Sequence, residues 1–187
     1  LQLYEHQKRL FQLSKSDKNK LILYQAPTGT GKTLSPLGLA KGKKIIFTCA
    51  AKHIGLRLAK ACISMEIPIA VAFGCKDPTD IRLHYFAAKE YVKHRKSGYI
   101  FRVDNSVGDK VEVIITDIQS YTCAMNYMLA FNDKKDIVWY WDEPTITLDY
   151  ETHEFHDILK DNWEKNEIGN VILSSATLPS KEEIMPM

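Results

Sequence analysis

The segment at residues 21–40 constrains the fold of this chain more than any other. It begins with a short apolar run at 21–24, which predicts a buried strand, and it ends with residues 34–40, which predict a helix. Between the two lies the sequence APTGTGKT at positions 26–33. A glycine-containing loop between a strand and a helix points backbone N–H groups at an anion, and the helix N-terminus adds positive potential. The segment therefore predicts an α/β fold with a phosphate-binding loop.

The side chains of this loop indicate what kind of phosphate it would hold. Lys32 would reach the β- and γ-phosphates of a nucleoside triphosphate, and the Thr33 hydroxyl would ligate Mg²⁺. The other residues of the predicted ATP-binding loop are Ala26, Pro27, Thr28, Gly29, Thr30 and Gly31. A chance glycine-rich turn would not explain a Gly-Lys-Thr triplet between a strand and a helix. We therefore expect the chain to bind ATP with Mg²⁺.

Composition narrows the class of protein. The 187 residues are enough for one domain, and 45% hydrophobic and 26% charged residues are typical of a globular protein. Because the sequence has neither a long apolar run nor a signal-peptide pattern, we expect no membrane partner and an intracellular location. The compartment would be the cytoplasm or nucleus. The four cysteines form no CxxC pair, which favours reduced, mostly buried thiols over an iron–sulfur cluster.

Charge is unevenly distributed along the chain. Residues 82–102 contain six lysines and arginines against one acidic residue, Glu90, whereas residues 142–167 contain nine acidic residues against two lysines. Such polarity predicts one face suited to a polyanion. Within the basic part, Lys93, Arg95 and Lys96 are candidates for binding the phosphates of a nucleic acid. The aromatic residues on either side of them, Tyr91, Tyr99 and Phe101, would stack bases or fill the core, and we expect them in the core.

Strand and helix patterns alternate along the rest of the chain. Strands are predicted at 44–48, 69–73, 99–103, 110–115, 137–141 and 171–173, and helices at 1–13, 54–65, 118–128 and 155–163. Asp77 and Pro78 predict the start of a further helix, in which apolar residues recur at helical spacing as far as Val92 and which stops before Gly98. The turn-rich residues 104–109 predict a hairpin between 99–103 and 110–115. The alternation predicts a mostly parallel sheet with helices on both faces.

Two further segments carry candidate chemistry. The apolar strand at 137–141 runs into Asp142 and Glu143, at the edge of the sheet where a phosphate loop would lie. Asp142 would hold Mg²⁺, and Glu143 would orient or deprotonate the attacking water. After the last strand come Ser175, Ala176 and Thr177, whose hydroxyl groups can hydrogen-bond carboxylates and couple them to the γ-phosphate.

In this order, A-x-x-G-x-G-K-T, D-E-x-x and S-A-T resemble the motifs of superfamily 2 helicases of the DEAD-like group. The second motif reads DEPT here, which keeps both carboxylates but not the DEAD or DEAH signature. The resemblance implies a RecA-like P-loop domain over residues 1–187 that hydrolyses ATP to move on or unwind DNA or RNA. It also implies a second RecA-like domain, not contained in this chain, which supplies an arginine finger.

The resemblance implies roles for two more residues. Tyr4-Glu5-His6-Gln7 resembles the adenine-reading Q motif, in which Gln7 would hydrogen-bond the base. The segment Ile115-Thr116-Asp117 occupies the place of a motif that contacts the nucleic-acid strand, with Thr116 as the candidate contact. Phe47-Thr48-Cys49-Ala50 stands at the place of another such motif but lacks its usual Pro-Thr. Residues 82–179 are most similar to helicases of large DNA viruses, of the poxvirus transcription type.

Two other classes of function fit parts of the pattern. A P-loop kinase would share the phosphate loop, but it would need a lid of arginines that the sequence lacks. A nucleic-acid-binding module with a structural nucleotide site would not need Lys32, Asp142 and Glu143 together. ATP hydrolysis measured with and without RNA or DNA separates the three.

Overall fold

The structure, a computed structural model, describes residues 5–14, 18–25, 35–144 and 154–175, with the side chains of 154 and 155 left out. In this part a seven-stranded sheet has the order β1-β9-β8-β2-β7-β3-β4, and every neighbouring pair is parallel except β3 and β4. Its strands are β1 (Lys20–Gln25), β2 (Lys44–Cys49), β3 (Ile69–Ala72), β4 (Arg82–Leu83), β7 (Val113–Asp117), β8 (Ile137–Asp142) and β9 (Asn170–Ser175). The predicted α/β fold is confirmed.

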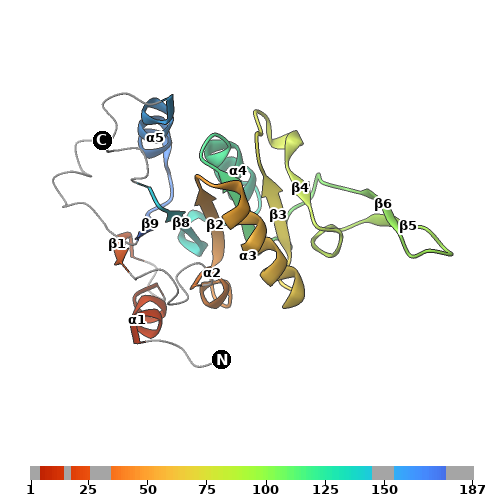
Figure 1. Ribbon diagram of the computed structural model, residues 1–187, viewed down its shortest axis with the longest axis horizontal. Coiled ribbons are helices and arrows are strands. Elements are labelled where there is room, and N and C mark those ends of the chain that lie inside the picture. Colours follow the sequence, from red (N-terminus) through yellow and green to blue (C-terminus); the bar gives the residue numbers. More distant parts are fainter. Residues whose placement is uncertain (1–4, 15–17, 26–34, 145–153, 176–187) are drawn as a thin grey trace.

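Helices cover both faces of this sheet (Figure 1). They are α1 (Glu5–Ser14), α2 (Ser35–Leu39), α3 (Lys52–Ser64), α4 (Tyr121–Leu129) and α5 (Glu154–Lys165), with short 3₁₀ turns η2 (Pro78–Asp80), η3 (Tyr85–Ala87) and η4 (Lys134–Asp136). Residues of α1, α2 and α3 share one buried cluster, and residues of α4 and α5 share the other. Alternate residues of β8 enter different clusters, Tyr140 the first and Trp139 the second, because strand side chains alternate between faces.

Strand β1 is less buried than its apolar sequence predicts. It lies at one edge of the described sheet and pairs with β9 alone. Tyr24 is buried, but Leu21 and Leu23 are 38% and 41% exposed. The alternation places these two leucines on the same face, which the described helices cover only in part at this edge.

The helix predicted after Asp77 is wrong beyond its first turn. The Asp77 carboxylate caps it by accepting from the Thr79 N–H at 2.9 Å, but the turn η2 ends at Asp80. The chain then pairs with β3 as the antiparallel strand β4, and the His84 N–H donates to the Ile69 carbonyl at 3.0 Å. Apolar residues at 81 and 83 fit a strand as well as a helix, and pairing with β3 buries both completely or nearly so.

The predicted hairpin around residues 104–109 is also wrong. Strand β6 (Ile100–Val103) pairs with β5 (Tyr91–Lys93), and these two form a separate ribbon that projects from the β4 side of the sheet (Figure 1). Strand β7 instead inserts between β2 and β3. Its apolar residues are completely buried, and only a central strand with helices on both faces can bury such a run.

Candidate functional site

Three strands bring the predicted site to one edge of the sheet. β9 lies between β1 and β8, and all three are parallel, so their carboxyl ends meet. Gln25 pairs with Ser175, and Asp142 pairs with Ser174. The predicted ATP-binding loop begins directly after Gln25 but lies outside the described residues, from Ala26 to Thr33. Its starting point is therefore one strand away from Asp142.

Glu143 and Ser175 are joined by a hydrogen bond. The Ser175 hydroxyl donates to Oε2 of Glu143 at 2.8 Å, and the Glu143 N–H donates to the Ser174 carbonyl at 2.7 Å. Glu143 has a φ of +51°, a left-handed conformation that is costly for a residue with a side chain. This conformation turns the chain sharply after β8, so the carboxylate stays beside β9. Ala176 and Thr177, the other predicted coupling residues, lie outside the described part.

Asp142 is the carboxylate that best fits a metal ion. It ends β8 with 5% of its surface exposed, and its negative charge contributes to raising the pKa of Cys49. Magnesium prefers carboxylate oxygen and keeps several waters, so a buried aspartate next to a phosphate site suits it. The second predicted ligand, Thr33, is outside the described residues. Within the described ranges, no three His, Cys, Asp or Glu side chains are grouped so that they could hold a metal by themselves.

The sheet beneath this edge is apolar enough to keep its thiols protonated. Burial is the main cause that raises the pKa of Cys49 to about 12, with smaller contributions from the charges of Asp142 and Asp117. Burial likewise raises the pKa of Cys62 to about 12. All four cysteines are free, and three of them are buried. They are unsuited to nucleophilic chemistry at neutral pH.

Helix α1 lies beside the strand that leads into the predicted loop. Its His6 Nδ1 is 2.5 Å from the Tyr24 hydroxyl, which is 3.3 Å from the Ser35 hydroxyl at the start of α2. Gln7, the predicted adenine-binding residue, is only 7% exposed. It is therefore not an ordinary surface glutamine, and its role in reading a base stays a prediction.

The strand-contacting role predicted for Thr116 does not fit its position. Its side chain is completely buried, and its hydroxyl donates to the Asp117 carbonyl at 2.7 Å. Asp117, which the sequence placed in the same segment without a role of its own, accepts from the N–H groups of Gly74 at 2.8 Å and Ser120 at 2.9 Å. It ties together the segments that follow β3 and β7. The signal was available, since Asp117 ends an apolar strand just as Asp142 does.

The three basic candidates lie elsewhere. Lys93, Arg95 and Lys96 are exposed on the β5–β6 ribbon, which the structure does not bring to the carboxyl edge of the sheet. The aromatic residues of this ribbon are exposed as well, so their predicted place in the core is wrong. Tyr91 is 45%, Tyr99 68% and Phe101 57% exposed.

No family model matches the sequence, and no curated protein matches it either. Solved structures do match. A DEAD box protein from Methanococcus jannaschii superposes with a TM-score of 0.58 at 16% identity, covering 98% of this chain and 46% of that one. The fold is that of a RecA-like helicase domain.

Two more structures match in the same way. The Pyrococcus furiosus Hef helicase domain superposes with a TM-score of 0.53 at 18% sequence identity. The match covers 96% of this chain and 34% of the Hef chain. A hypothetical ATP-dependent RNA helicase from Sulfolobus tokodaii superposes with a TM-score of 0.56 at 15% sequence identity. The match covers 100% of this chain and 49% of that helicase. This chain thus spans less than half of each matched structure. None of the three is viral, so the narrower resemblance to poxvirus-type helicases gains no support. In the described part, no helix has the length and apolarity to cross a bilayer.

Proposed function

We propose that this chain is the ATP-binding domain of a superfamily 2 helicase or translocase, which hydrolyses ATP with Mg²⁺ to move on or unwind DNA or RNA. The observation that carries the proposal is the hydrogen bond from Ser175 to Glu143, one strand away from the start of the ATP-binding loop. It links a candidate hydrolytic carboxylate to the segment that continues into Ala176 and Thr177. A purely structural nucleotide site would not need this link.

Each residue has a proposed task at this edge. Lys32 and the loop N–H groups bind the phosphates, and Thr33 and Asp142 hold Mg²⁺, which supplies positive charge to the phosphate oxygens. Glu143 orients the attacking water or takes its proton. Ser175 fixes the Glu143 carboxylate, and Gln7 reads the adenine. A second RecA-like domain supplies the cation that completes the site.

Nucleic acid is the proposed partner of the basic surface. Lys93, Arg95 and Lys96 would bind phosphates, and the names of the matched helicases agree with such a partner. A P-loop kinase is the second candidate function, because its phosphate loop would have the same sequence pattern. No observation in the described residues favours it.

The test compares two variants of the nucleotide site. Lys32→Ala should sharply weaken binding of a fluorescent ATP analogue and abolish hydrolysis, because charge-assisted contacts to phosphate are among the stronger ones available. Glu143→Gln should keep the analogue bound and stop hydrolysis, because it leaves Asp142 for the metal. Glu164→Gln, on the exposed part of α5, is the matched control and should change neither property.

Hydrolysis by the full-length protein, with its second RecA-like domain, and by its variants is measured with and without single-stranded RNA and DNA. Stimulation by polynucleotide supports a helicase or translocase. Unstimulated hydrolysis that depends on a small acceptor, or equal loss of ATP binding in both variants, would contradict the proposal.

A further inference from the structure

The β5–β6 ribbon is a separate two-stranded sheet that stands apart from the seven-stranded one. Figure 1 shows it projecting from the domain on the side of β4, the edge opposite β1. The chain enters and leaves this excursion at the amino end of β3, where the His84 N–H donates to Ile69 and the Glu112 N–H donates to Pro68. The ribbon is therefore remote from the carboxyl ends of the strands, where the ATP site is proposed.

The outer half of the ribbon exposes two aromatic rings. Tyr99 and Phe101 have 68% and 57% of their surface exposed, more than any other large hydrophobic residue of the described part. The pairing register shifts between Val92 and Lys93, which leaves Phe101 as the extra residue of a bulge. A bulge re-aims a side chain, and here it keeps the phenyl ring out of the core.

The same ribbon carries three cationic side chains. Lys93, Arg95 and Lys96 are exposed, and Arg95 and Lys96 sit in the turn at the tip of the ribbon. The turn is closed by backbone bonds from His94 to the Tyr99 carbonyl at 2.7 Å and from Gly98 to the His94 carbonyl at 3.0 Å. Gly98 has a φ of +72°, which glycine adopts without strain. The tip thus has a defined backbone conformation, and the cationic and aromatic residues lie within nine positions of one another on the same exposed ribbon.

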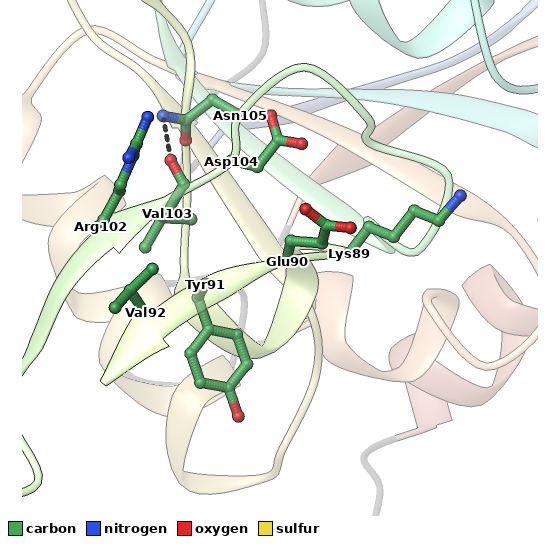
Figure 2. A pocket seen from close by; sticks show the side chains of 8 residues that line it. All are labelled: Lys89, Glu90, Tyr91, Val92, Arg102, Val103, Asp104 and Asn105. Atoms are coloured by element: carbon green, nitrogen blue, oxygen red, sulfur yellow. Dashed lines mark hydrogen bonds between the residues drawn. The ribbon is translucent and has the colours of Figure 1, made fainter. Parts of the chain in front are cut away.

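The base of the ribbon is anchored to the domain. The Asn105 side chain accepts from the Leu83 N–H at 2.8 Å and donates to the Val103 carbonyl at 3.3 Å, and Tyr127 of α4 donates to the Asn105 carbonyl at 3.1 Å. Tyr91 packs against Tyr85, with ring centroids 5.2 Å apart. A pocket of about 800 Å³ lies at this base, and Figure 2 shows the side chains that line it. It is lined by Lys89, Glu90, Tyr91, Val92, Arg102, Val103, Asp104 and Asn105.

We propose that the β5–β6 ribbon is an accessory site for single-stranded nucleic acid, outside the motor site, in which Tyr99 and Phe101 stack on bases while Lys93, Arg95 and Lys96 bind phosphates. Positive charge next to exposed rings matches a polyanion that carries unpaired bases, because every base has a face that can stack. Duplex hides those faces, so the site prefers a single strand. The choice of ligand rests on the proposed function, whereas the role of the rings rests on their exposure.

The test measures binding of the 187-residue chain to three fluorescein-labelled 20-mers: oligo(dT), oligo(U) and an abasic DNA of equal length. Wild type should bind oligo(dT) more tightly than the abasic strand, which has the same phosphates without bases. Tyr99→Ala/Phe101→Ala should weaken oligo(dT) binding by about tenfold per ring and remove this preference, with an unchanged salt dependence. Oligo(U) shows whether RNA binds equally well.

Three comparisons sharpen the result. Tyr99→Phe/Phe101→Tyr keeps both rings and should bind like wild type. Leu56→Ala/Ile63→Ala removes two exposed apolar side chains from α3 and should also bind like wild type. Lys93→Ala/Arg95→Ala/Lys96→Ala should weaken all strands alike and lower the salt slope by roughly 0.7 for each phosphate that the variant no longer binds. Binding of the ATP analogue should be unchanged in every ribbon variant.

The outcomes separate this inference from the proposed function. Equal binding of oligo(dT) and the abasic strand by wild type, or a preference for oligo(dT) that the ring variant leaves intact, overturns the stacking site even if ATP hydrolysis is stimulated normally. Loss of the base preference on removing the rings supports it, even in a chain that fails to hydrolyse ATP. Circular dichroism of each variant shows that the exposed changes leave the fold intact.

Discussion

At the scale of single residues, the edge of the sheet where we propose the nucleotide site has a few polar contacts in an apolar surrounding. Glu143 is held by one donor from β9, the Ser175 hydroxyl at 2.8 Å, and by a left-handed backbone that few residues tolerate. Asp142, its neighbour, is buried at the end of β8. The two carboxylates therefore have different surroundings, which agrees with different tasks for them.

Ser175→Ala should slow ATP hydrolysis without weakening ATP binding. Without this hydrogen bond the Glu143 carboxylate is less well oriented, and we expect kcat to fall about tenfold, or ~1.4 kcal/mol in activation free energy. Steady-state kinetics of the variant would give kcat and KM separately. Ser175→Thr keeps a hydroxyl and should recover most of the rate; a raised KM at normal kcat would contradict the positioning role.

The buried thiols should be unreactive in the native chain. Because burial raises the pKa of Cys49 and Cys62 to about 12 from an ordinary 9.0, both remain thiols at pH 8. A thiol reagent at pH 8 should modify the half-buried Cys123 first, and these two only after unfolding, as peptide mapping would show. Since their folded pKa values are raised, the stability they contribute is complete below pH 9 and is lost as pH rises toward 12. A melting temperature that rose between pH 9 and pH 11 would contradict this direction.

At the scale of elements, β8 carries an aromatic stack on the face of the sheet that α4 covers. Trp139 is completely buried, stacks on Tyr121 of α4 with centroids 3.8 Å apart and on Trp141 at 4.7 Å, and donates to the Thr48 hydroxyl at 2.9 Å. One side chain thus connects β8 to a helix and to β2. The carboxylates that follow β8 owe their fixed position to this packing.

Trp139→Ala should destabilise the chain by about 3–5 kcal/mol, because it leaves a large cavity and an unpaired Thr48 hydroxyl. Urea denaturation would measure the loss. Trp139→Phe keeps an aromatic ring in the stack and should cost less. Tyr99→Ala, at the most exposed aromatic residue of the ribbon, should stay within about 0.5 kcal/mol of wild type. A small effect of Trp139→Ala would mean that the stack does not hold β8 in place.

At the scale of the whole molecule, we propose that this chain is one of the two RecA-like domains of a helicase or translocase. It spans less than half of each matched helicase structure, and the proposed transition-state cation comes from a second domain. The nucleotide edge lies toward β1, and the β5–β6 ribbon projects from the opposite side (Figure 1). ATP binding and ribbon binding should therefore be separable by mutation.

The 187-residue chain alone should bind adenine nucleotide weakly and show negligible unwinding. An arginine supplied by a second domain typically contributes about 10³–10⁵ in rate, which this chain would lack. Single-turnover hydrolysis and a strand-displacement assay would measure both activities. Rapid, polynucleotide-stimulated turnover by this chain alone would contradict the two-domain proposal.

Local sequence patterns were sufficient for the parallel core. Apolar runs at 44–48 and 137–141 form central strands, and Asp142 and Glu143 follow the second of them. Such runs are too short for a helix and rich in β-branched and aromatic residues, and a parallel sheet covered on both faces can bury them. The helices α3, α4 and α5 follow from their apolar spacing in the same way. The order of motifs also placed Ser175 at the same edge as Glu143, since parallel strands end together.

Only the tertiary structure decided which strands pair and which side chains are covered. The apolar residues of 81–92 have a spacing that fits a helix, yet Arg82 and Leu83 pair with the edge of β3 as a strand. Local spacing does not record this pairing, because its partners lie elsewhere along the chain. Long-range pairing also places β7 between β2 and β3, so that β6 pairs with β5 instead of with β7. The exposure of Tyr99 and Phe101 follows from their position on this separate ribbon. Periodicity records which residues could be buried together, whereas long-range pairing determines which of them are buried.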